Sequence, residues 1–141
     1  MIAAQAYQST VNKQPFLINP ADITVVGILG KAHSGKGTIA QIATRQEFGY
    51  TELEMARSLK KAARVIFHLD YDSVSTEDGK KGYDGYWELT NRRILQLLGT
   101  EAMQPTFGKE VWCKSSHIEM YKLWSQVYKS AFIFSDIRFS H

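Results

Sequence analysis

Apolar residues in this chain gather in short runs that are separated by stretches with helical spacing. Two runs, residues 23–29 and 131–135, have the length of strands and are apolar or β-branched at most positions. Strands that are covered on both faces of a parallel sheet have this composition. A weaker alternation over residues 50–55 predicts a third, shorter strand. Apolar stripes predict helices over residues 37–48, 58–66, 90–98 and 110–128. Because strands alternate with helices, the expected fold class is α/β with a parallel sheet.

The predicted helices carry capping residues at their ends. Gly49 is expected to end the first helix and Gly99 the third, because glycine adopts the left-handed backbone of a helix C-terminus at little cost. Ser58 and Thr90 are expected to cap the N-termini of the second and third helices, since their hydroxyl oxygens accept hydrogen bonds from free amides of the first turn.

Two polar segments show no clear periodicity. Residues 1–22 predict an irregular, partly disordered extension outside a core formed by residues 23–141. Residues 71–87 contain several glycine-based turn signals and predict a long mobile loop, either functional or a plain insertion. The expected aromatic anchors of this loop are Tyr83, Tyr86 and Trp87.

The composition is that of one globular domain of 141 residues, 44% hydrophobic and 22% charged. The net charge of +3 comes from scattered basic pairs, most of which solvated helix faces explain. Small anionic ligands explain the charge as well as nucleic acid does, and no nucleic-acid partner is expected. The single Cys113 cannot form an internal disulfide, which fits a reducing compartment such as the cytoplasm. Cys113 and His117 lack a third ligand and are interpreted as structural. No secretory signal or bilayer-spanning run is recognised, so no membrane partner is expected.

The most informative motif follows the first predicted strand. Gly30, Gly35 and Lys36 have the spacing of a phosphate-binding loop, and a predicted helix comes next. Glycines let successive amides point at phosphate oxygens, the helix N-terminus favours the same anion, and the lysine adds a mobile charge. Gly37 separates the lysine from Thr38, although the pattern expects a hydroxyl residue directly after the lysine. The alternative is an ordinary glycine-rich turn between a strand and a helix.

The last predicted strand delivers two charged residues, Asp136 and Arg138, to its C-terminal end. Ligands of open α/β sheets bind beyond the C-terminal ends of the strands. An acidic residue there suits Mg²⁺ or its waters, and an arginine suits a phosphate group in transfer. A structural Asp–Arg pair is the alternative interpretation.

Several stretches together resemble a known family. The loop ending at Thr38 is similar to that of the nucleoside monophosphate kinases, in which a glycine also follows the lysine. The wider pattern resembles the deoxynucleoside monophosphate kinases typical of bacteriophages, and it covers roughly residues 23–139. It is carried by Trp112 and by the segments Met55-Ala56-Arg57-Ser58-Leu59-Lys60, Thr90-Asn91-Arg92-Arg93-Ile94-Leu95-Gln96-Leu97-Leu98-Gly99-Thr100-Glu101 and Ser135-Asp136-Ile137-Arg138-Phe139.

The resemblance implies a P-loop NTPase-like three-layer αβα fold that transfers the γ-phosphoryl group of ATP to a deoxynucleoside monophosphate, with Mg²⁺. The implied catalytic residues are Lys36, Asp136 and Arg138. ATP would be bound by Gly30, Ser34, Gly35, Lys36, Gly37 and Thr38, the acceptor by Arg92, Gln96 and Arg138, and Mg²⁺ by Asp136 and Thr38. The implied location is the cytoplasm, that of the host if the chain is phage-encoded.

The chain also departs from the family pattern. Arg57 stands where an aspartate is usual, and Gln104 stands where the family usually has an arginine, whose loss would weaken phosphate binding. The strands and mobile lid that follow in related kinases are expected to be missing, which leaves strand 23–29 with an unpaired apolar edge. We expect this edge to be covered by a second copy of the chain, by a separately encoded remainder of the kinase, or by residues 1–22. A truncated product is the alternative.

The sequence is therefore compatible with three functions. The first is a deoxynucleoside monophosphate kinase, favoured by Lys36, Asp136 and Arg138. The second is a catalytically weak nucleotide- or protein-binding module derived from such a kinase, favoured by Gln104 and the missing lid. The third is a kinase for another small phosphorylated acceptor.

Overall fold

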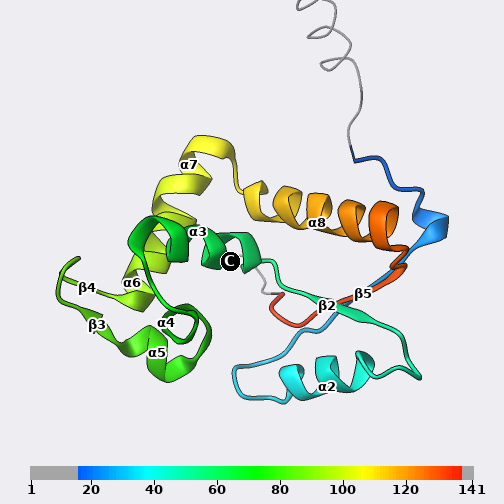
Figure 1. Ribbon diagram of the computed structural model, residues 1–141, viewed down its shortest axis with the longest axis horizontal. Coiled ribbons are helices and arrows are strands. Elements are labelled where there is room, and N and C mark those ends of the chain that lie inside the picture. The colour runs from blue at the N-terminus through cyan, green and yellow to red at the C-terminus, as the bar shows by residue number, and fades with distance from the viewer. Residues whose placement is uncertain (1–15, 138–141) are drawn as a thin grey trace, which may run out of the picture.

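Three parallel strands form the centre of the structure, a computed structural model that describes residues 16–137. The strand order is β1-β5-β2, with β1 at Thr24–Gly27, β5 at Ala131–Phe134 and β2 at Thr51–Leu53. The last strand in sequence is thus the central one, as its apolar run predicts. Helix α2 (Lys36–Ala43) lies on one side of the sheet and α8 (Val111–Val127) on the other (Figure 1). The chain is therefore α/β, and its layers are compatible with an αβα arrangement.

The main core lies between the sheet and α8. Phe132 and Phe134 point to the same face of β5, since side chains alternate along a strand, and both are almost fully buried with Leu53. Met120, Leu123 and Trp124 of α8 pack against this cluster. Ile133 points to the opposite face and is also buried. The central strand is thus covered on both faces, which explains its continuous apolar sequence.

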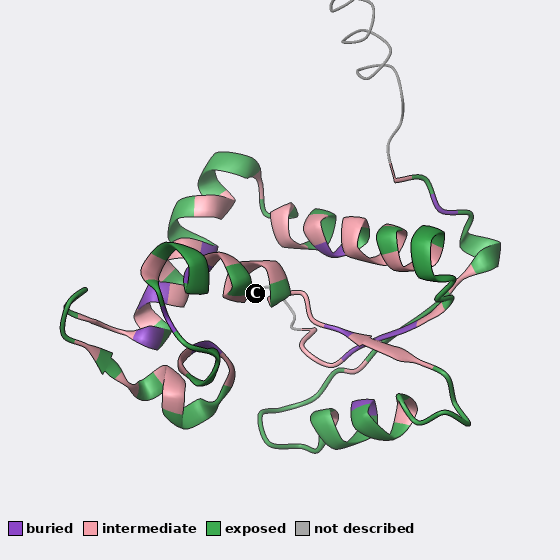
Figure 2. Cartoon of the chain, viewed as in Figure 1, coloured by how far each residue is buried: buried purple, intermediate pink, exposed green. Residues whose placement is uncertain are grey.

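A second core lies away from the sheet, where α3 (Arg57–Phe67), α4 (Tyr71–Ser75) and α6 (Asn91–Gln96) meet. Figure 2 shows buried positions in both cores, and also on α2 and in the segment before β1. The buried members of the second core are Ala63, Leu69, Val74 and Ile94. This helical lobe forms one end of the molecule in Figure 1.

Residues 71–87 contain regular elements, so the prediction of a long loop is wrong. They form α4, α5 (Glu77–Lys81) and the strand β3 (Tyr83–Asp84), which pairs with β4 (Leu89–Thr90). Asp70 caps α4 by accepting from Ser73 N at 2.8 Å. The turn chemistry of this segment therefore joins short regular elements.

Only one of the three expected aromatic anchors of that segment anchors it. Trp87 Nε1 donates to Phe67 O at 3.1 Å, and the two rings meet edge to face. Tyr83 and Tyr86 are exposed, so they were wrongly expected to hold the segment. Tyr86 reaches no further than the ring of its neighbour Trp87.

Thr90 caps α6 as predicted, by accepting from Arg93 N at 3.2 Å. Gly99, however, does not end the helix, because the chain continues through a π-helical turn (Leu97–Ala102) into α7 (Met103–Phe107). Gly99 is buried, and a β-carbon there would collide with the Leu59 side chain of α3. The glycine permits close helix packing instead of a stop.

Two other helix ends also differ from expectation. Helix α2 ends at Ala43, five residues early, because residues 44–48 form turns before Gly49, whose φ is 70°. Ser58 lies inside α3 and caps nothing, and its Oγ lies 2.5 Å from Ser115 Oγ of α8. Helix α8 matches its predicted range closely.

The described part of the expected N-terminal extension packs on α8. Ile18 is buried, and the Phe16 ring meets the Tyr121 ring edge to face. Residues 16–22 include the short 3₁₀ helix η1 (Pro20–Asp22) and lead directly into β1. They do not cover the edge of β1, and residues 1–15 lie outside the described part of the chain.

The outer edge of β1 has no partner strand among residues 16–137, as expected. Val25 and Val26 point to opposite faces of the sheet and remain 48% and 37% exposed. The sheet is therefore open on this side within the described residues. None of the helices in that part of the chain is long and apolar enough to cross a membrane.

Candidate active site

The loop between β1 and α2 turns through two residues with left-handed backbone. His33 and Gly35 have φ values of 60° and 88°, in the left-handed region, and α2 begins directly afterwards at Lys36. Ile39 N is the first helical amide to donate along α2, to Gly35 O at 3.1 Å. The amides of Lys36, Gly37 and Thr38 therefore lie in the first turn, where no helical acceptor exists. Such amides suit a phosphate group.

The Lys36 side chain folds back over this loop. Its Nζ donates to the carbonyl oxygens of Gly30 and Lys31, each at 2.7 Å. A β-carbon at Gly30 would lie only 2.7 Å from Ser34 Oγ, so a larger residue there would force the Ser34 side chain to shift. Gly30, Ser34 and Lys36 are thus brought together as the sequence predicts. The ammonium group is held over the loop without a carboxylate partner in the described part of the chain.

Gly37 and Thr38 lie at the exposed start of α2. A side chain at Gly37 would meet no heavy atom within 4 Å, so local packing does not require this glycine. Thr38 is exposed, and its hydroxyl makes no hydrogen bond within residues 16–137. Both residues face solvent on the first turn that follows the loop.

The strand register brings Asp136 to the same edge of the sheet as the loop. β1 and β5 pair in parallel from Thr24↔Ala131 to Gly27↔Phe134, so their C-terminal ends coincide. Ile28 N also donates to Phe134 O at 2.8 Å, which extends the pairing to the start of the loop. Asp136 follows two residues after β5, while Arg138 lies outside the described residues.

The Asp136 carboxylate binds the N-terminus of α3. Oδ1 accepts from Met55 N at 2.9 Å and Oδ2 accepts from Ala56 N at 3.0 Å. This explains why α3 needs no side-chain cap of its own, because a carboxylate at a helix N-terminus satisfies free amides and interacts favourably with the helix dipole. Asp136 thereby ties β5 to the helical lobe.

A cavity of about 520 Å³ opens between Asp136 and the helical lobe. We call it the cationic cavity, because four basic side chains line it: Lys60 of α3, Lys80 of α5, Arg92 of α6 and Lys109. Gln104, Trp112 and the free, exposed Cys113 line another part of its wall. The cavity therefore offers a surplus of positive charge and an aromatic side chain beyond the C-terminal ends of the strands.

The cavity contains some of the predicted residues and not others. Arg92, Asp136 and Gln104 line it. Gln96 is exposed on α6 and does not, and Arg57 lines a separate cavity of about 360 Å³ on the other side of Lys60. The loop between β1 and α2 lies outside both cavities.

Sequence reasoning missed three cations of the cavity: Lys60, Lys80 and Lys109. Lys60 and Lys80 belong to the basic pairs Lys60-Lys61 and Lys80-Lys81, which look like solvated helix faces. A signal existed for Lys60, which ends one of the segments that resemble the kinase family. No such signal marks Lys80, because its position depends on the unexpected helix α5.

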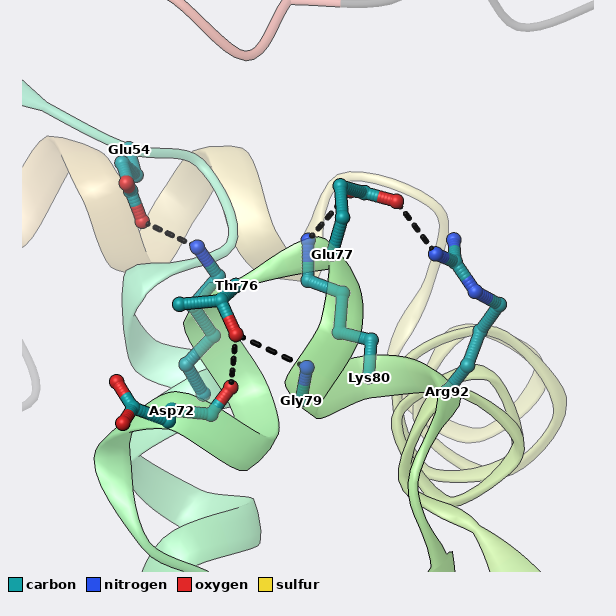
Figure 3. A network of polar contacts seen from close by, with 8 residues as sticks. Glu54, Asp72, Thr76, Glu77, Gly79, Lys80 and Arg92 are labelled. Atoms are coloured by element: carbon teal, nitrogen blue, oxygen red, sulfur yellow. Dashed lines mark hydrogen bonds and ion pairs between the residues drawn. The ribbon is translucent and has the colours of Figure 1, made fainter.

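Acidic side chains pair with these cations, as Figure 3 shows. Glu54 Oε2 lies 2.8 Å from Lys60 Nζ, and Glu77 Oε2 accepts from Arg92 Nη2 at 2.7 Å. The hydrogen bond from Arg92 and then the charge of Lys80 lower the pKa of Glu77 below its ordinary value. Glu77 therefore stays ionised through the neutral range.

Within residues 16–137, no group of three or more His, Cys, Asp or Glu side chains is placed to hold a metal ion. Cys113 and His117 are both exposed, and His117 Nε2 lies 2.7 Å from Phe16 O. No family model matches this chain, and neither the curated proteins nor the solved structures contain a match to it.

Proposed function

We propose that this chain is a nucleotide kinase that transfers the γ-phosphoryl group of ATP to a deoxynucleoside monophosphate. The observation that carries the proposal is the position of Lys36 Nζ, 2.7 Å from the carbonyl oxygens of Gly30 and Lys31. A lysine held over a loop with left-handed glycine geometry, at the start of a helix, suits a phosphate chain.

The proposal divides the work between two places at the same edge of the sheet. Loop amides and Lys36 would bind the donor phosphates, while the cationic cavity, with Arg92 and Lys80, would bind the acceptor phosphate. Phosphoryl transfer needs mainly positioning and neutralisation of charge, so a dedicated acid or base is not required.

The residues fit Mg²⁺ as a substrate-bound ion. Mg²⁺ at phosphate sites uses one or two protein oxygens, with phosphate and water oxygens completing its shell. Each Asp136 oxygen keeps a lone pair besides its amide bond, and the Thr38 hydroxyl is free among the described residues. Asp136 and Thr38 are the residues we propose to hold it. When bound, the ion supplies neutralisation of phosphate charge.

A coupled assay with ATP and each deoxynucleoside monophosphate tests the proposal. Lys36→Ala is expected to lower kcat/KM at least about 100-fold, because it removes a charge from the transferred group. Lys31→Ala is the matched control, since only the backbone carbonyl of Lys31 is used in the loop. Its activity is expected to stay within about 3-fold of wild type.

A nucleotide-binding module without turnover is the second candidate, and two observations favour it. Both Asp136 oxygens already accept amide hydrogens, and Gln104 stands in the cavity wall where the kinase pattern has a cation. ATP binding that is lost in Lys36→Ala, without turnover of any deoxynucleoside monophosphate, would establish the module and reject the enzyme.

A further inference from the structure

A carboxylate beside the cationic cavity already binds two of its cations. Glu77 Oε2 accepts from Arg92 Nη2 at 2.7 Å, and Glu77 Oε1 lies 3.4 Å from Lys80 Nζ (Figure 3). Arg92 and Lys80 line the cavity, whereas Glu77 does not. The two cations that an entering anion would meet are therefore partly neutralised by a residue outside the wall.

The backbone that carries Glu77 is firmly held. Thr76 Oγ1 donates to Asp72 O at 3.0 Å and accepts from Gly79 N at 2.9 Å. Asn91 Nδ2 donates to Gly79 O at 2.8 Å, which ties α5 to the start of α6. A β-carbon at Gly79 would collide with the Asp72 carbonyl group, so α4 and α5 are in close contact.

The side chain of Glu77, in contrast, is 53% exposed and so is that of Arg92. Ion pairs between such exposed groups are weak. Since the backbone is held and the pair is weak, the Glu77 carboxylate can leave Arg92 by rotation of its side chain alone.

The charges of the cavity indicate what would replace this carboxylate. Its four cations are accompanied by Asp136 in the wall and by Glu54, which lies 2.8 Å from Lys60. With Glu77 also in place, the positive surplus is one, and with Glu77 turned away it is two. A phosphate monoester carries a charge of about −1.5 to −2 at pH 7. The surplus without Glu77 thus matches a phosphate dianion.

We propose that Glu77 is a displaceable counter-ion, which Arg92 and Lys80 exchange for the phosphate group of an entering phosphate monoester. Glu77 positions these two cations toward the cavity before the ligand arrives, and it competes with the ligand for them. The inference rests on the proposed function, because it takes the cationic cavity as the acceptor site. The exchange involves no covalent step.

Isothermal titration calorimetry tests the exchange by measuring the affinity for inorganic phosphate and for each deoxynucleoside monophosphate. Glu77→Gln is expected to bind each of these ligands about 3- to 10-fold more tightly than wild type, because the competing charge is gone. Asp78→Asn is the matched control, since it removes the same charge from the neighbouring first-turn residue of α5. Its affinity is expected to change less than about 2-fold.

A second readout separates competition from a general effect on folding. In NMR spectra of wild type, the side-chain Nε–H signal of Arg92 is expected to shift on addition of phosphate. In Glu77→Gln without phosphate, this signal is expected to lie already at a position that differs from that of wild type. If turnover is observed, Glu77→Gln lowers the acceptor KM and leaves kcat within about 2-fold.

Two results would overturn the inference: equal phosphate affinity in wild type, Glu77→Gln and Asp78→Asn, or no phosphate binding to any of them. Failure of the proposed function looks different. If the protein shows no turnover but Glu77→Gln still binds phosphate more tightly than wild type, the exchange is supported and the kinase function is rejected. If the protein shows turnover but Glu77→Gln leaves the acceptor KM unchanged, the kinase function is supported and the exchange is rejected.

Discussion

The side chain of Ile137 fills the space that a β-carbon at Gly27 would occupy. Gly27 is the last residue of β1, directly before the loop that leads to α2, and Ile137 follows Asp136 and lines the cationic cavity. The loop side of the candidate site and the cavity side are therefore in van der Waals contact, although their residues lie at opposite ends of the described chain.

Gly27→Ala should therefore destabilise the protein. Gly27 is exposed, and the added methyl group would meet the end of the Ile137 side chain, which can turn away, so the expected cost is at most about 1 kcal/mol. Chemical denaturation measures the free energy of unfolding. Ile137→Ala in the same chain makes room for the methyl group, so the double variant should recover part of the loss. Additive losses would show that the contact is not the cause.

Asp136→Asn should lower stability whether or not Mg²⁺ is present. The amide side chain has one acceptor oxygen, so either Met55 N or Ala56 N loses its partner. The expected loss is about 1–2 kcal/mol, as for other lost N-terminal caps. Thermal unfolding with and without Mg²⁺ measures it. A loss seen only with Mg²⁺ would assign Asp136 to the metal alone.

Gly35→Ala should impair the loop more than Gly37→Ala does. Gly35 has a φ of 88°, where a β-carbon is strained by about 1–2 kcal/mol, whereas a side chain at Gly37 meets open space. ATP affinity of the two variants, measured by calorimetry, compares them. Equal losses of affinity would mean that the left-handed geometry at Gly35 is not needed for binding.

The Glu77 ion pairs should make stability depend on acidic pH. Because Arg92 and Lys80 lower the pKa of Glu77 from its ordinary value of 4.5, the unfolded chain binds more protons there. The contribution is complete above about pH 4.5 and is lost as the pH falls through the lowered pKa. Unfolding of wild type and Glu77→Gln from pH 3 to 7 should therefore differ least at the acidic end.

The sequence predicts the sheet and the loop well, because their signals are local or strongly periodic. The run at Phe132 and Phe134 predicts a central strand, and Gly35-Lys36 predicts the turn into α2, as the structure has them. The helical lobe was harder to predict. Gly99 reads as a helix stop, but its small size serves the packing of Leu59, a contact 40 residues away that no local pattern encodes.

The cavity shows the same limit. Arg92 and Asp136 are recognisable because they belong to motifs, while Lys80 enters the wall only through α5, which the turn-rich sequence of residues 71–87 conceals. Asp136 also has a partner that its motif does not indicate, since its oxygens accept from the amides of Met55 and Ala56. Tertiary contacts decide these positions.

The π-helical turn at Leu97–Ala102 determines which of the residues after it line the cavity. A π-helical turn holds one residue more than an α-helical turn, so it is equivalent to a single inserted residue. If the same residues formed regular α-helix instead, everything that follows would be rotated by about 100°. Gln104 would then turn out of the cavity wall, while Arg92, which precedes the turn, would stay. The extra residue of this turn, more than the composition of the helix, thus determines which polar side chains face the cavity.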